Sequence, residues 1–552
     1  MQVNLVFPPF TVPSVPLGIA HLKSYIEENS NFKVKCFDLN AEYLSMLYDN
    51  IDALCSTIGN NGDGTRRQPG AKEIRESMDV LKGVNAGFFD QSTYNHAAEV
   101  FTTYFKSVSD AFLANCGRSI KGEQAPPDII SEYADLLLEN SPDVVGFSVM
   151  FPEQLGCSIL LARALRKSGK ELKIVFGGAT GSTVPDFPVI DFVVTNEGEE
   201  ALLALVTALN EGNGLDSVPN LLPGRKYGHA CAGQQSPTSM LTKLDKIPFP
   251  DFSDFNLESG YLSPSTVIPI LGSRGCYWRK CAFCVHHKTY SEKYRVASIK
   301  HVIDEIEQHV DKGFRYFSFV DEMIPPKRFR LLSAEIRKRN LDITYYALAQ
   351  PTDRFSREIL EDMYDSGCRY ILWGVESGSQ RVLDLIDKGT TVETVSRVLT
   401  ESAAAGIKNH AFIIIGFPTE TIEELQDTLN FLYNHQDSIH QIHKGAFSLH
   451  QGSGVYKNPD KFNITKISEP GRAIGDVPCG FEVSSGISPE DAQKYLGYLN
   501  KGYFNDFSYF SGWLTVLRDH GLVLYSNPDK LVFNMGRRSV RSPADINFQF
   551  SA

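Results

Sequence analysis

Long apolar runs and a secretory leader are both missing from this sequence. It contains no run of about 18 apolar residues, the length that a membrane-spanning helix requires. The first residues lack the basic-then-apolar pattern of a signal peptide, and Val3–Phe7 has the composition of a β-strand. Internal repeats and low-complexity tracts are missing as well. We therefore expect a globular chain with no secreted or membrane-embedded part.

Positive charge is the minority sign. The 552 residues include 54 Lys and Arg against 66 Asp and Glu, which gives a formal net charge of −12. This balance disfavours binding to nucleic acid or to an anionic membrane surface. Hydrophobic residues make up 42% of the chain, an ordinary fraction for a globular protein. A chain of this length divides into about two to four domains.

Cysteine is sparse, and seven of the ten cysteines are scattered singly. Such cysteines are typical of reduced core thiols in a cytoplasmic, reducing compartment. The other three, Cys276, Cys281 and Cys284, lie within nine residues. Thiolate clusters of this density bind soft metals, and three ligands are one short of a closed four-cysteine site. An iron–sulfur cluster held in this way keeps one iron open to a substrate or cosubstrate.

Two other interpretations of these cysteines remain open. A structural zinc site needs a fourth ligand, and His286 and His287 are near enough in sequence to supply one. Buried thiols without a ligand are disfavoured because Arg274, Arg279 and Lys280 make the segment too polar for a core. The same basic residues suit a cluster of net negative charge.

The cysteine segment resembles the motif of radical S-adenosylmethionine (SAM) enzymes, C-x3-C-x2-C with an aromatic residue before the last cysteine. Phe283 is that aromatic residue, whereas the first gap, Tyr277 to Lys280, has four residues rather than three. The resemblance implies a [4Fe-4S] cluster on the three cysteines and S-adenosyl-L-methionine on the open iron, with Phe283 in the SAM site. It also implies an electron donor such as flavodoxin or ferredoxin.

The first 205 residues alternate β-rich runs with helical patterns, which predicts a parallel sheet in a Rossmann-like, doubly wound α/β domain. Residues 41–140 interrupt this rhythm and are expected to form a mostly helical insertion. The predicted strands are Val3–Phe7, Lys33–Phe37, Asp143–Val149, Lys173–Phe176 and Phe192–Val194.

Ligands of such sheets bind beyond the carboxyl ends of the strands, where this chain has many small residues. No G-x-G-x-x-G follows the first strand, so a nicotinamide or flavin dinucleotide is disfavoured. One alternative is that the glycines only make turns. The motifs Phe7-Pro8-Pro9, Gly146-Phe147-Ser148, Phe176-Gly177-Gly178 and Glu197-Gly198-Glu199 nevertheless resemble the cobalamin-binding domain that precedes many radical SAM domains.

This second resemblance implies cobalamin as a further cofactor. The D-x-H-x-x-G motif, which supplies a histidine to cobalt in other cobalamin proteins, is missing, so no protein histidine on cobalt is expected. The residues expected to contact cobalamin are Pro9, Phe10, Pro16, Leu17, Gly18, Ser148, Gln154, Gly177, Gly178, Ala179, Glu197 and Gly198.

Residues 206–260 are rich in Pro, Gly and Asp and are predicted to form a linker. The βα rhythm then resumes over residues 261–460, which predicts the partial (βα)6 barrel of the radical SAM fold. The expected strands are Val267–Leu271, Tyr316–Val320, Thr344–Leu348, Tyr370–Trp373, Asn409–Ile415 and His443–Phe447.

Polar residues follow several of these strands, and the carboxyl ends of the strands form the active face of a βα barrel. Asp321 and Glu322 are expected at the ammonium of SAM, Glu376 and Ser377 at its ribose or carboxylate, and the Gly416 backbone at its adenine. The resemblance supports these positions, since Gly374–Gly378 and Ile415–Pro418 look like the SAM motifs of the family. Each acidic residue alone fits a helix N-cap equally well.

Residues 461–552 contain no comparable motif. They are predicted to form a small, mostly helical C-terminal domain that caps the barrel. Tyr and Phe are dense from Tyr495 to Trp513. Packing onto the barrel mouth is the simpler explanation of these aromatics, and a substrate-binding wall is the alternative.

Together these features predict a cobalamin-dependent radical SAM C-methyltransferase. The 5′-deoxyadenosyl radical and methylcobalamin would methylate an unactivated carbon of a peptide or small natural product. A related enzyme that cyclises or rearranges its substrate without methylation is the main alternative. A non-enzymatic cobalamin or redox sensor is disfavoured because sensing needs no open iron surrounded by SAM-binding residues. No side-chain acid or base is assigned a catalytic role.

Overall fold

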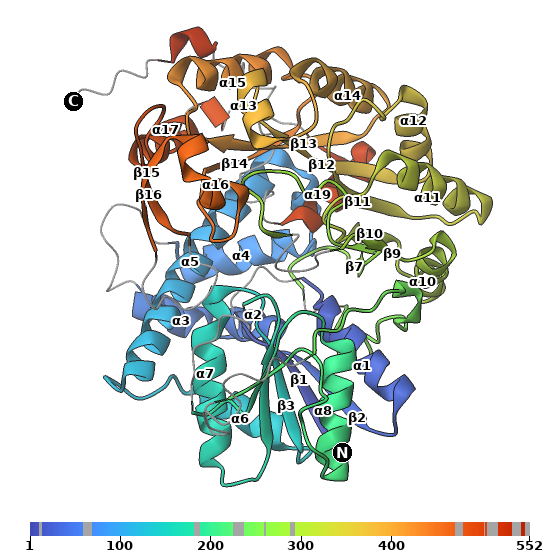
Figure 1. Ribbon diagram of the computed structural model, residues 1–552, viewed down its shortest axis with the longest axis vertical. Coiled ribbons are helices and arrows are strands. Elements are labelled where there is room, and N and C mark those ends of the chain that lie inside the picture. The colour runs from blue at the N-terminus through green and yellow to red at the C-terminus, as the bar shows by residue number, and fades with distance from the viewer. Residues whose placement is uncertain are drawn as a thin grey trace. The chain divides into compact units, whose positions relative to one another are not determined.

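The computed structural model describes residues 1–9, 14–58, 69–180, 188–224, 237–258, 261–286, 293–469, 478–501, 503–504, 517–532 and 542–546. The chain divides into two units (Figure 1). The first contains Met1–Asp79 and Val100–Leu262, and the second contains Val80–Glu99, Ser263–Gly471 and Val477–Ala552. No helix among the described residues is both long enough and apolar enough to cross a bilayer.

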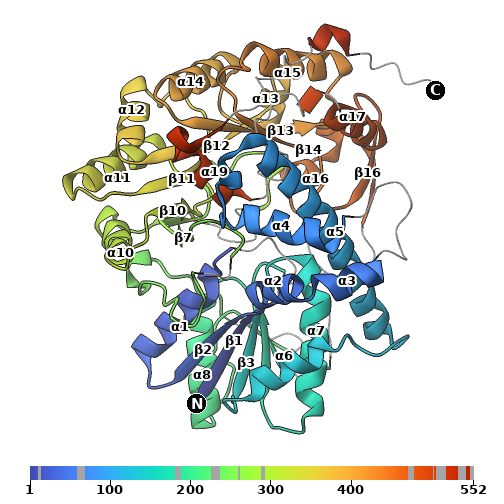
Figure 2. The ribbon, with the colours of Figure 1, turned by 180° about the vertical axis from the view of Figure 1, so that it is seen from behind.

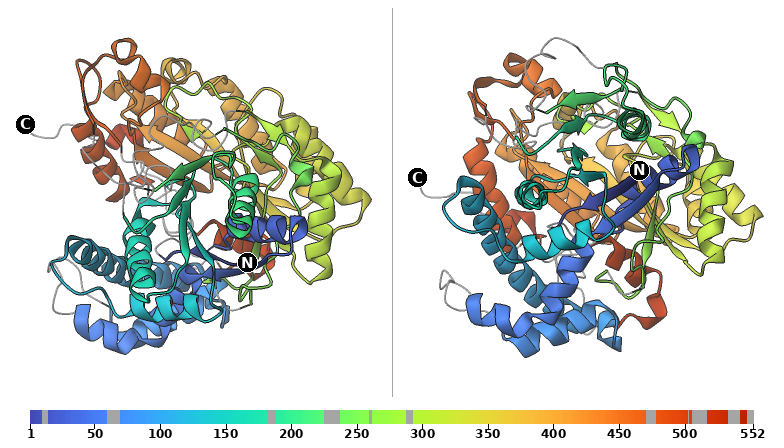
Figure 3. Two further views of the ribbon diagram at one scale, coloured as in Figure 1. Left: turned by 60° about the horizontal axis from the view of Figure 1, so that its bottom comes forward. Right: turned by 90° about the horizontal axis from the view of Figure 1, so that it is seen from below.

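A six-stranded sheet forms the centre of the first unit, in the order β2-β1-β3-β4-β5-β6. Its first five strands are parallel, as predicted, and β6 adds an antiparallel edge. The strand order 2-1-3-4-5 is that of a doubly wound fold, whose helices cover both faces (Figure 3). The strands are β1 (Gln2–Phe7), β2 (Lys33–Asp38), β3 (Val144–Ser148), β4 (Lys173–Gly177), β5 (Phe192–Val194) and β6 (Leu221–Pro223).

Helices α1 and α8 pack together, as do α6 and α7, and the predicted helical insertion is confirmed as α2 to α6. Residues 80–99 of that insertion belong to the second unit. The bounds are α1 (Leu17–Asn29), α2 (Leu39–Asp49), α3 (Ile51–Ile58), α4 (Ala71–Leu81), α5 (Gln91–Lys121), α6 (Ile129–Leu138), α7 (Pro152–Lys167) and α8 (Glu199–Glu211).

The predicted linker, residues 206–260, is instead part of the first unit, which extends to Leu262. Its described part packs onto α1 and β2. The buried Lys23 ammonium pairs with Asp254 at 2.7 Å and Asp251 at 3.0 Å, and the Tyr261 hydroxyl donates to the Asp38 carboxylate at 2.8 Å. Proline, glycine and aspartate suggested a linker, but these long-range polar contacts fix its described part to α1 and β2.

The second unit confirms the predicted partial barrel. Six parallel strands run in the order β14-β13-β12-β11-β10-β7, and β7 is not paired with β14 among the described residues. The strands are β7 (Val267–Ile270), β10 (Tyr316–Phe319), β11 (Thr344–Ala349), β12 (Cys368–Glu376), β13 (Lys408–Ile415) and β14 (Gln441–Ala446).

Helices cover the outer face of this sheet (Figure 2). Trp373 and Asn409 point to this face, where Asn409 bonds to Ser402 and Leu399 of α14. Because side chains alternate along a strand, Tyr370, Gly374, His410 and Phe412 lie on the inner face. The helices are α10 (Ile299–Asp311), α11 (Pro326–Lys338), α12 (Arg357–Asp365), α13 (Gln380–Ile386), α14 (Val392–Ala404) and α15 (Ile422–Asn434).

The described parts of the C-terminal region group by their contacts with the barrel unit. Helix α19 (Arg518–Tyr525) contacts β10, β11 and β12, and α17 (Pro489–Lys501) contacts β14. Burial of apolar residues such as Leu522 and Leu524 explains why this segment joins the barrel core. Residues 502 and 505–513 of the aromatic run from Tyr495 to Trp513 lie outside the described residues. Within it, Tyr503 donates to the Leu429 carbonyl on α15 at 2.6 Å.

Candidate cofactor-binding sites

The three clustered cysteines follow β7 and the short strand β8 (Ser273–Arg274), and all three are half-buried. Burial raises the pKa of the Cys281 thiol to about 12 and also raises that of Cys284. These thiols would stay protonated at neutral pH unless a metal displaced the protons. No three His, Cys, Asp or Glu of the described residues converge on a single ion.

Backbone hydrogen bonds hold the middle of this cysteine loop in place. The Ala282 N–H donates to the Ile386 carbonyl at the end of α13 at 2.7 Å. The Ala282 carbonyl accepts from Val455 of α16 (Gly454–Lys457) at 2.9 Å. Phe283 packs against the apolar cluster that contains Val382 and Ile386. The loop is thus anchored between two helices, and Phe283 contributes to that anchorage.

The additional residue between the first two cysteines has a defined place. Arg279 adopts a left-handed backbone with φ 55°, which non-glycine residues seldom occupy. The Trp278 indole N–H donates to the Asp387 carbonyl at 2.7 Å, and a Cβ on Gly389 would lie 2.0 Å from the indole ring. The longer gap therefore lets Trp278 dock on the turn that follows α13.

The same turn carries Lys388, whose ammonium forms a 2.6 Å ion pair with Glu376. The two side chains are only 3% and 8% exposed. Glu376 sits at a β-bulge with φ 68°, and a Cβ on Gly374 would lie 2.6 Å from the ammonium and 2.8 Å from the carboxylate. Gly374 is therefore needed to make room for the pair.

Lys388 was missed by the sequence analysis. Burial lowers the pKa of its ammonium, but Glu376 and the Cys281 sulfur outweigh burial, so the pKa stands above its ordinary value. The charged ammonium thus lies close enough to the cysteines to stabilise thiolates or a bound carboxylate. The only sequence signal was a Lys-Gly pair after the helix that follows Glu376.

Asp321 and Glu322, which the sequence analysis treated together, have different surroundings. Asp321 is buried, accepts from the Gly272 N–H at 2.9 Å and accepts from the Ser273 hydroxyl. It thereby fixes the start of the cysteine loop, and its expected contact with SAM has no support in this geometry. Glu322 is half-buried, and its Oε2 is buried without a hydrogen-bond partner. Burial and then Asp321 raise the pKa of Glu322 to about 7.

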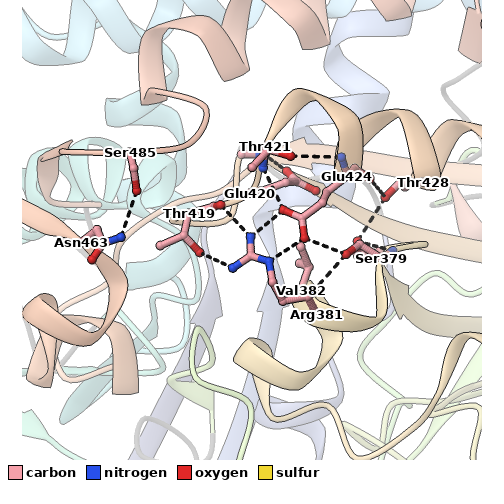
Figure 4. A network of polar contacts seen from close by, with 12 residues as sticks. Ser379, Arg381, Val382, Thr419, Glu420, Thr421, Glu424, Thr428, Asn463 and Ser485 are labelled. Atoms are coloured by element: carbon pink, nitrogen blue, oxygen red, sulfur yellow. Dashed lines mark hydrogen bonds and ion pairs between the residues drawn. The ribbon is translucent and has the colours of Figure 1, made fainter.

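The ends of β12 and β13 are joined by a polar network (Figure 4). Arg381 pairs with Glu424 at 2.5 Å and donates to the Thr419 carbonyl at 2.7 Å, which supports the left-handed Thr419, φ 77°. Ser377 bonds to the Thr428 hydroxyl at 3.1 Å. Ser377 therefore serves to connect β12 to α15.

Gly416 closes the end of β13. Its N–H donates to Glu420 Oε2 at 2.5 Å, and with φ 72° a Cβ here would lie 2.5 Å from that of Ala492. Only glycine fits at this position, and its N–H, which was expected to contact adenine, is bonded to Glu420 instead. Glu420 is fully buried, its Oε1 has no partner, and burial raises its pKa to about 8.

The strand ends of the first unit form the second candidate site. Gln154 is fully buried, donates to the Pro8 carbonyl at 2.6 Å and accepts from Met150 and Phe151 N–H groups at 2.8 and 3.1 Å. Glu197 accepts from the Leu241 N–H at 2.8 Å. Both residues thus tie loops together, which was not the role expected of them.

The other residues predicted at this edge differ in exposure, and two of the glycines are accessible. Gly18 is exposed with nothing within 4 Å of an added Cβ, and Gly178, φ 90°, is exposed where the loops after β3 and β4 touch. Phe151 is 47% exposed, which leaves an apolar ring for a large flat ligand. Leu17, Ser148, Gly177 and Ala179 are half-buried, Pro9 and Pro16 are buried, Gly198 begins α8 against Leu22, and Phe10 lies outside the described residues.

The residues present fit the implied cofactors. Three clustered cysteines, a buried Lys388 and an unpartnered Glu322 oxygen suit a cluster with a chelating amino acid. At the first unit's edge, Gly18, Gly178 and the exposed Phe151 ring leave room for a large flat ligand such as cobalamin.

Family models match both domains. Residues 270–432 match the radical SAM superfamily and residues 112–206 match the B12 binding domain. The chain therefore carries a B12-binding domain followed by a radical SAM domain, with the [4Fe-4S] cluster, SAM and cobalamin as their cofactors.

Two curated relatives carry different activities. The cytidylyl-2-hydroxyethylphosphonate methyltransferase of Streptomyces wedmorensis is 30% identical over 344 residues, 54% of this chain and 64% of that protein. The anaerobic magnesium-protoporphyrin IX monomethyl ester cyclase of Rubrivivax gelatinosus is 30% identical over 304 residues, 52% of this chain and 53% of that protein. The matched part of this chain thus covers between about half and two thirds of the length of these two relatives.

One solved structure is similar over nearly the whole chain. The cobalamin-dependent S-adenosylmethionine radical enzyme OxsB, with aqua-cobalamin and S-adenosylmethionine bound, aligns with a TM-score of 0.63 at 16% identity. The alignment covers 96% of this chain and 70% of that one. At this identity the similarity concerns the fold.

Proposed function

We propose that this chain, with its B12-binding and radical SAM domains, is a cobalamin-dependent radical SAM methyltransferase that methylates a carbon of a peptide or small natural product. One observation carries the radical SAM part. The cysteine loop lies beside the buried Lys388–Glu376 pair and the unpartnered Glu322 oxygen, so metal ligands and amino-acid-binding charges share one strand edge.

The chain's own residues bind and orient the cofactors. Cys276, Cys281 and Cys284 would hold three irons, and Lys388 would offset their negative charge. Glu322 is suited to the ammonium of SAM and Lys388 to its carboxylate, because opposite charges attract strongly in a partly dry site. When bound, the cluster, SAM and cobalamin supply one-electron cleavage of SAM and methyl transfer.

Methyl transfer is favoured over other outcomes by the methyltransferase relative. The cyclase relative favours the second candidate, a cyclisation or rearrangement without methylation. A flavodoxin or ferredoxin is the proposed electron donor, since the reduction of the cluster requires a low-potential partner.

Anaerobic reconstitution tests the proposal. The protein is loaded with iron, sulfide and cobalamin, and SAM and dithionite are added. We expect 5′-deoxyadenosine, a cobalamin absorbance spectrum, and loss of SAM cleavage in Cys281→Ala but not in the buried-thiol control Cys116→Ala. Retained cleavage in Cys281→Ala would refute the cluster assignment.

The reaction type has its own readout. Once a substrate is found, a product heavier by one methylene supports methylation. Formation of 5′-deoxyadenosine with no change in product mass would instead support the cyclase-like alternative.

A further inference from the structure

A row of residues crosses the inner face of the barrel sheet. Gly374 pairs with Phe412, and Phe412 pairs with His443, on adjacent strands. The Lys388–Glu376 pair contacts the Gly374 end of this row. Strands stand about 4.8 Å apart, so His443 lies about 10 Å along the row from Gly374. The far end of the row is therefore separate from the charges assigned to SAM.

Arg518 lies against Phe412, the middle residue of this row. It is the first residue of α19, which lies beside β11 and β12 (Figure 1), and its guanidinium lies over the Phe412 ring, 5.8 Å from the centroid. The side chain is half-buried, yet within the described part of the chain it has no hydrogen bond or ion pair. The next residue, Asp519, bonds instead to the Tyr346 hydroxyl at 3.2 Å. A partly desolvated guanidinium without a counter-ion is costly unless an anion joins it.

Two buried polar side chains near Arg518 also have atoms without a hydrogen-bond partner. His410 is fully buried, and its Nδ1 bonds to the Tyr370 hydroxyl at 2.6 Å while its Nε2 has no partner. Gln441, opposite His410 on β14, is fully buried with neither amide atom bonded. Unsatisfied buried polar atoms mark places where a ligand or water completes the structure.

His443 supplies an accessible donor. Its side chain is exposed, while its ring lies 5.2 Å from that of Phe412 and 6.3 Å from that of His410. Although the side chain is exposed, neighbouring protein atoms partly desolvate the ring, and this desolvation, then the positive charge of Arg518, lowers the pKa of His443 to about 4. Lys444 is on the opposite face of β14, near Phe504. The neutral His443 ring and the Arg518 cation therefore both lie against the Phe412 ring.

We infer that Arg518 and His443, with His410 and Gln441 behind them, bind an anionic group of the organic substrate, a carboxylate or a phosphate. This inference rests on the proposed function. A guanidinium recognises either group through paired N–H bonds, and the uncapped N-terminus of α19 adds backbone N–H groups. The carboxylate of SAM is the other source of such a group, but Lys388 is placed nearer the cysteines to receive it.

Inorganic phosphate is the probe. The full-length protein, loaded with cluster and cobalamin, is titrated by isothermal calorimetry. We expect one phosphate per chain, about tenfold weaker binding in Arg518→Gln because a charge-assisted hydrogen bond is lost, and weaker binding in His443→Ala. Arg330→Gln, the same change on the exposed face of α11, should bind as the wild type does.

Several outcomes would overturn the inference. The site is refuted if the wild type does not bind phosphate. It is also refuted if Arg518→Gln and His443→Ala both bind phosphate as tightly as the wild type does. Displacement of phosphate by saturating SAM assigns the anion to SAM and refutes a substrate site. Iron content, cobalamin content and Tm show whether Arg518→Gln has folded, and His443→Ala tests the site if it has not. Failure of SAM cleavage in the wild type would refute the proposed function without changing the phosphate result.

Discussion

The indole of Trp278 lies against Gly389, so close that a single added carbon at Gly389 would collide with the ring. Lys280 covers the same indole, with its ammonium 4.8 Å from the ring centroid. Through this contact the cysteine loop touches the turn that carries Lys388. This packing contact thus links the segment of the cluster ligands to the turn of the buried ammonium.

Substitution of Gly389 by Ala should loosen the cluster site. We expect fewer irons per chain and an altered electron paramagnetic resonance spectrum of the reduced cluster upon SAM addition. Gly452→Ala is the matched control, because Gly452 also has positive φ (87°, against 69°) but open space around it. Equal effects of the two substitutions would mean that backbone strain alone is responsible. In a Trp278→Ala background the Gly389→Ala effect should shrink, since the collision is gone.

Removal of the Lys388 charge should destabilise the protein. Lys388→Met leaves the Glu376 carboxylate buried and unpaired, at a cost of about 3–5 kcal/mol. Chemical denaturation measures the loss in free energy of unfolding. Adding Glu376→Gln to Lys388→Met should restore part of this free energy. Lys466→Met is the control, because the Lys466–Glu482 pair is exposed and should contribute little. A Lys388→Met protein as stable as the wild type would contradict a buried ion pair.

The buried Glu420 should make stability depend on pH. Its pKa is about 8 in the folded protein against an ordinary 4.5, so between these values the folded state binds more protons than the unfolded state. Stability therefore falls as pH rises through this window. Glu420→Gln should match the wild type near pH 5 and exceed its Tm near pH 8. Glu423→Gln, on the exposed side of α15, should follow the wild type; a Glu420→Gln curve parallel to the wild type would refute the shift.

Gly178 should be needed for cobalamin retention. A Cβ there would lie 2.5 Å from the Val149 carbonyl oxygen, so Gly178→Ala should push the two loops apart. Gly122→Ala has a comparable positive φ, 80° against 90°, without any neighbour within 4 Å, and controls for the strain of about 1–2 kcal/mol. We expect less cobalamin per chain after gel filtration for Gly178→Ala alone. Equal retention by both variants would argue against this edge as the cobalamin site.

Patterns along the chain predicted the architecture well but predicted individual site residues less reliably. Strand periodicity is local, so both parallel sheets could be recognised from apolar runs separated by helices. The linker predicted over residues 206–260 groups with the first unit because the contacts that hold residues 237–258, such as Lys23 with Asp254, join positions far apart in sequence. A proline-rich segment can be fixed by partners that its own composition does not reveal.

Residues adjacent in sequence can also have different roles in the structure. Asp321 and Glu322 are both acidic residues directly after a strand, so the sequence did not distinguish them. Consecutive side chains there point in different directions. Asp321 therefore satisfies buried N–H and O–H groups, while the Glu322 Oε2 remains unpartnered. Gln154 and Glu197 likewise look like ligand contacts in sequence and serve as loop ties in the structure.

The sequence by itself determined the two βα domains and the three clustered cysteines, because both signals depend on the spacing of nearby residues. Tertiary structure alone decided that Lys388 pairs with Glu376, that Trp278 docks on Gly389, and that Arg518 reaches the row of Phe412 and His443. These contacts depend on how strands and turns are brought together by burial of apolar surface. No local pattern encodes which distant charge a buried group will meet.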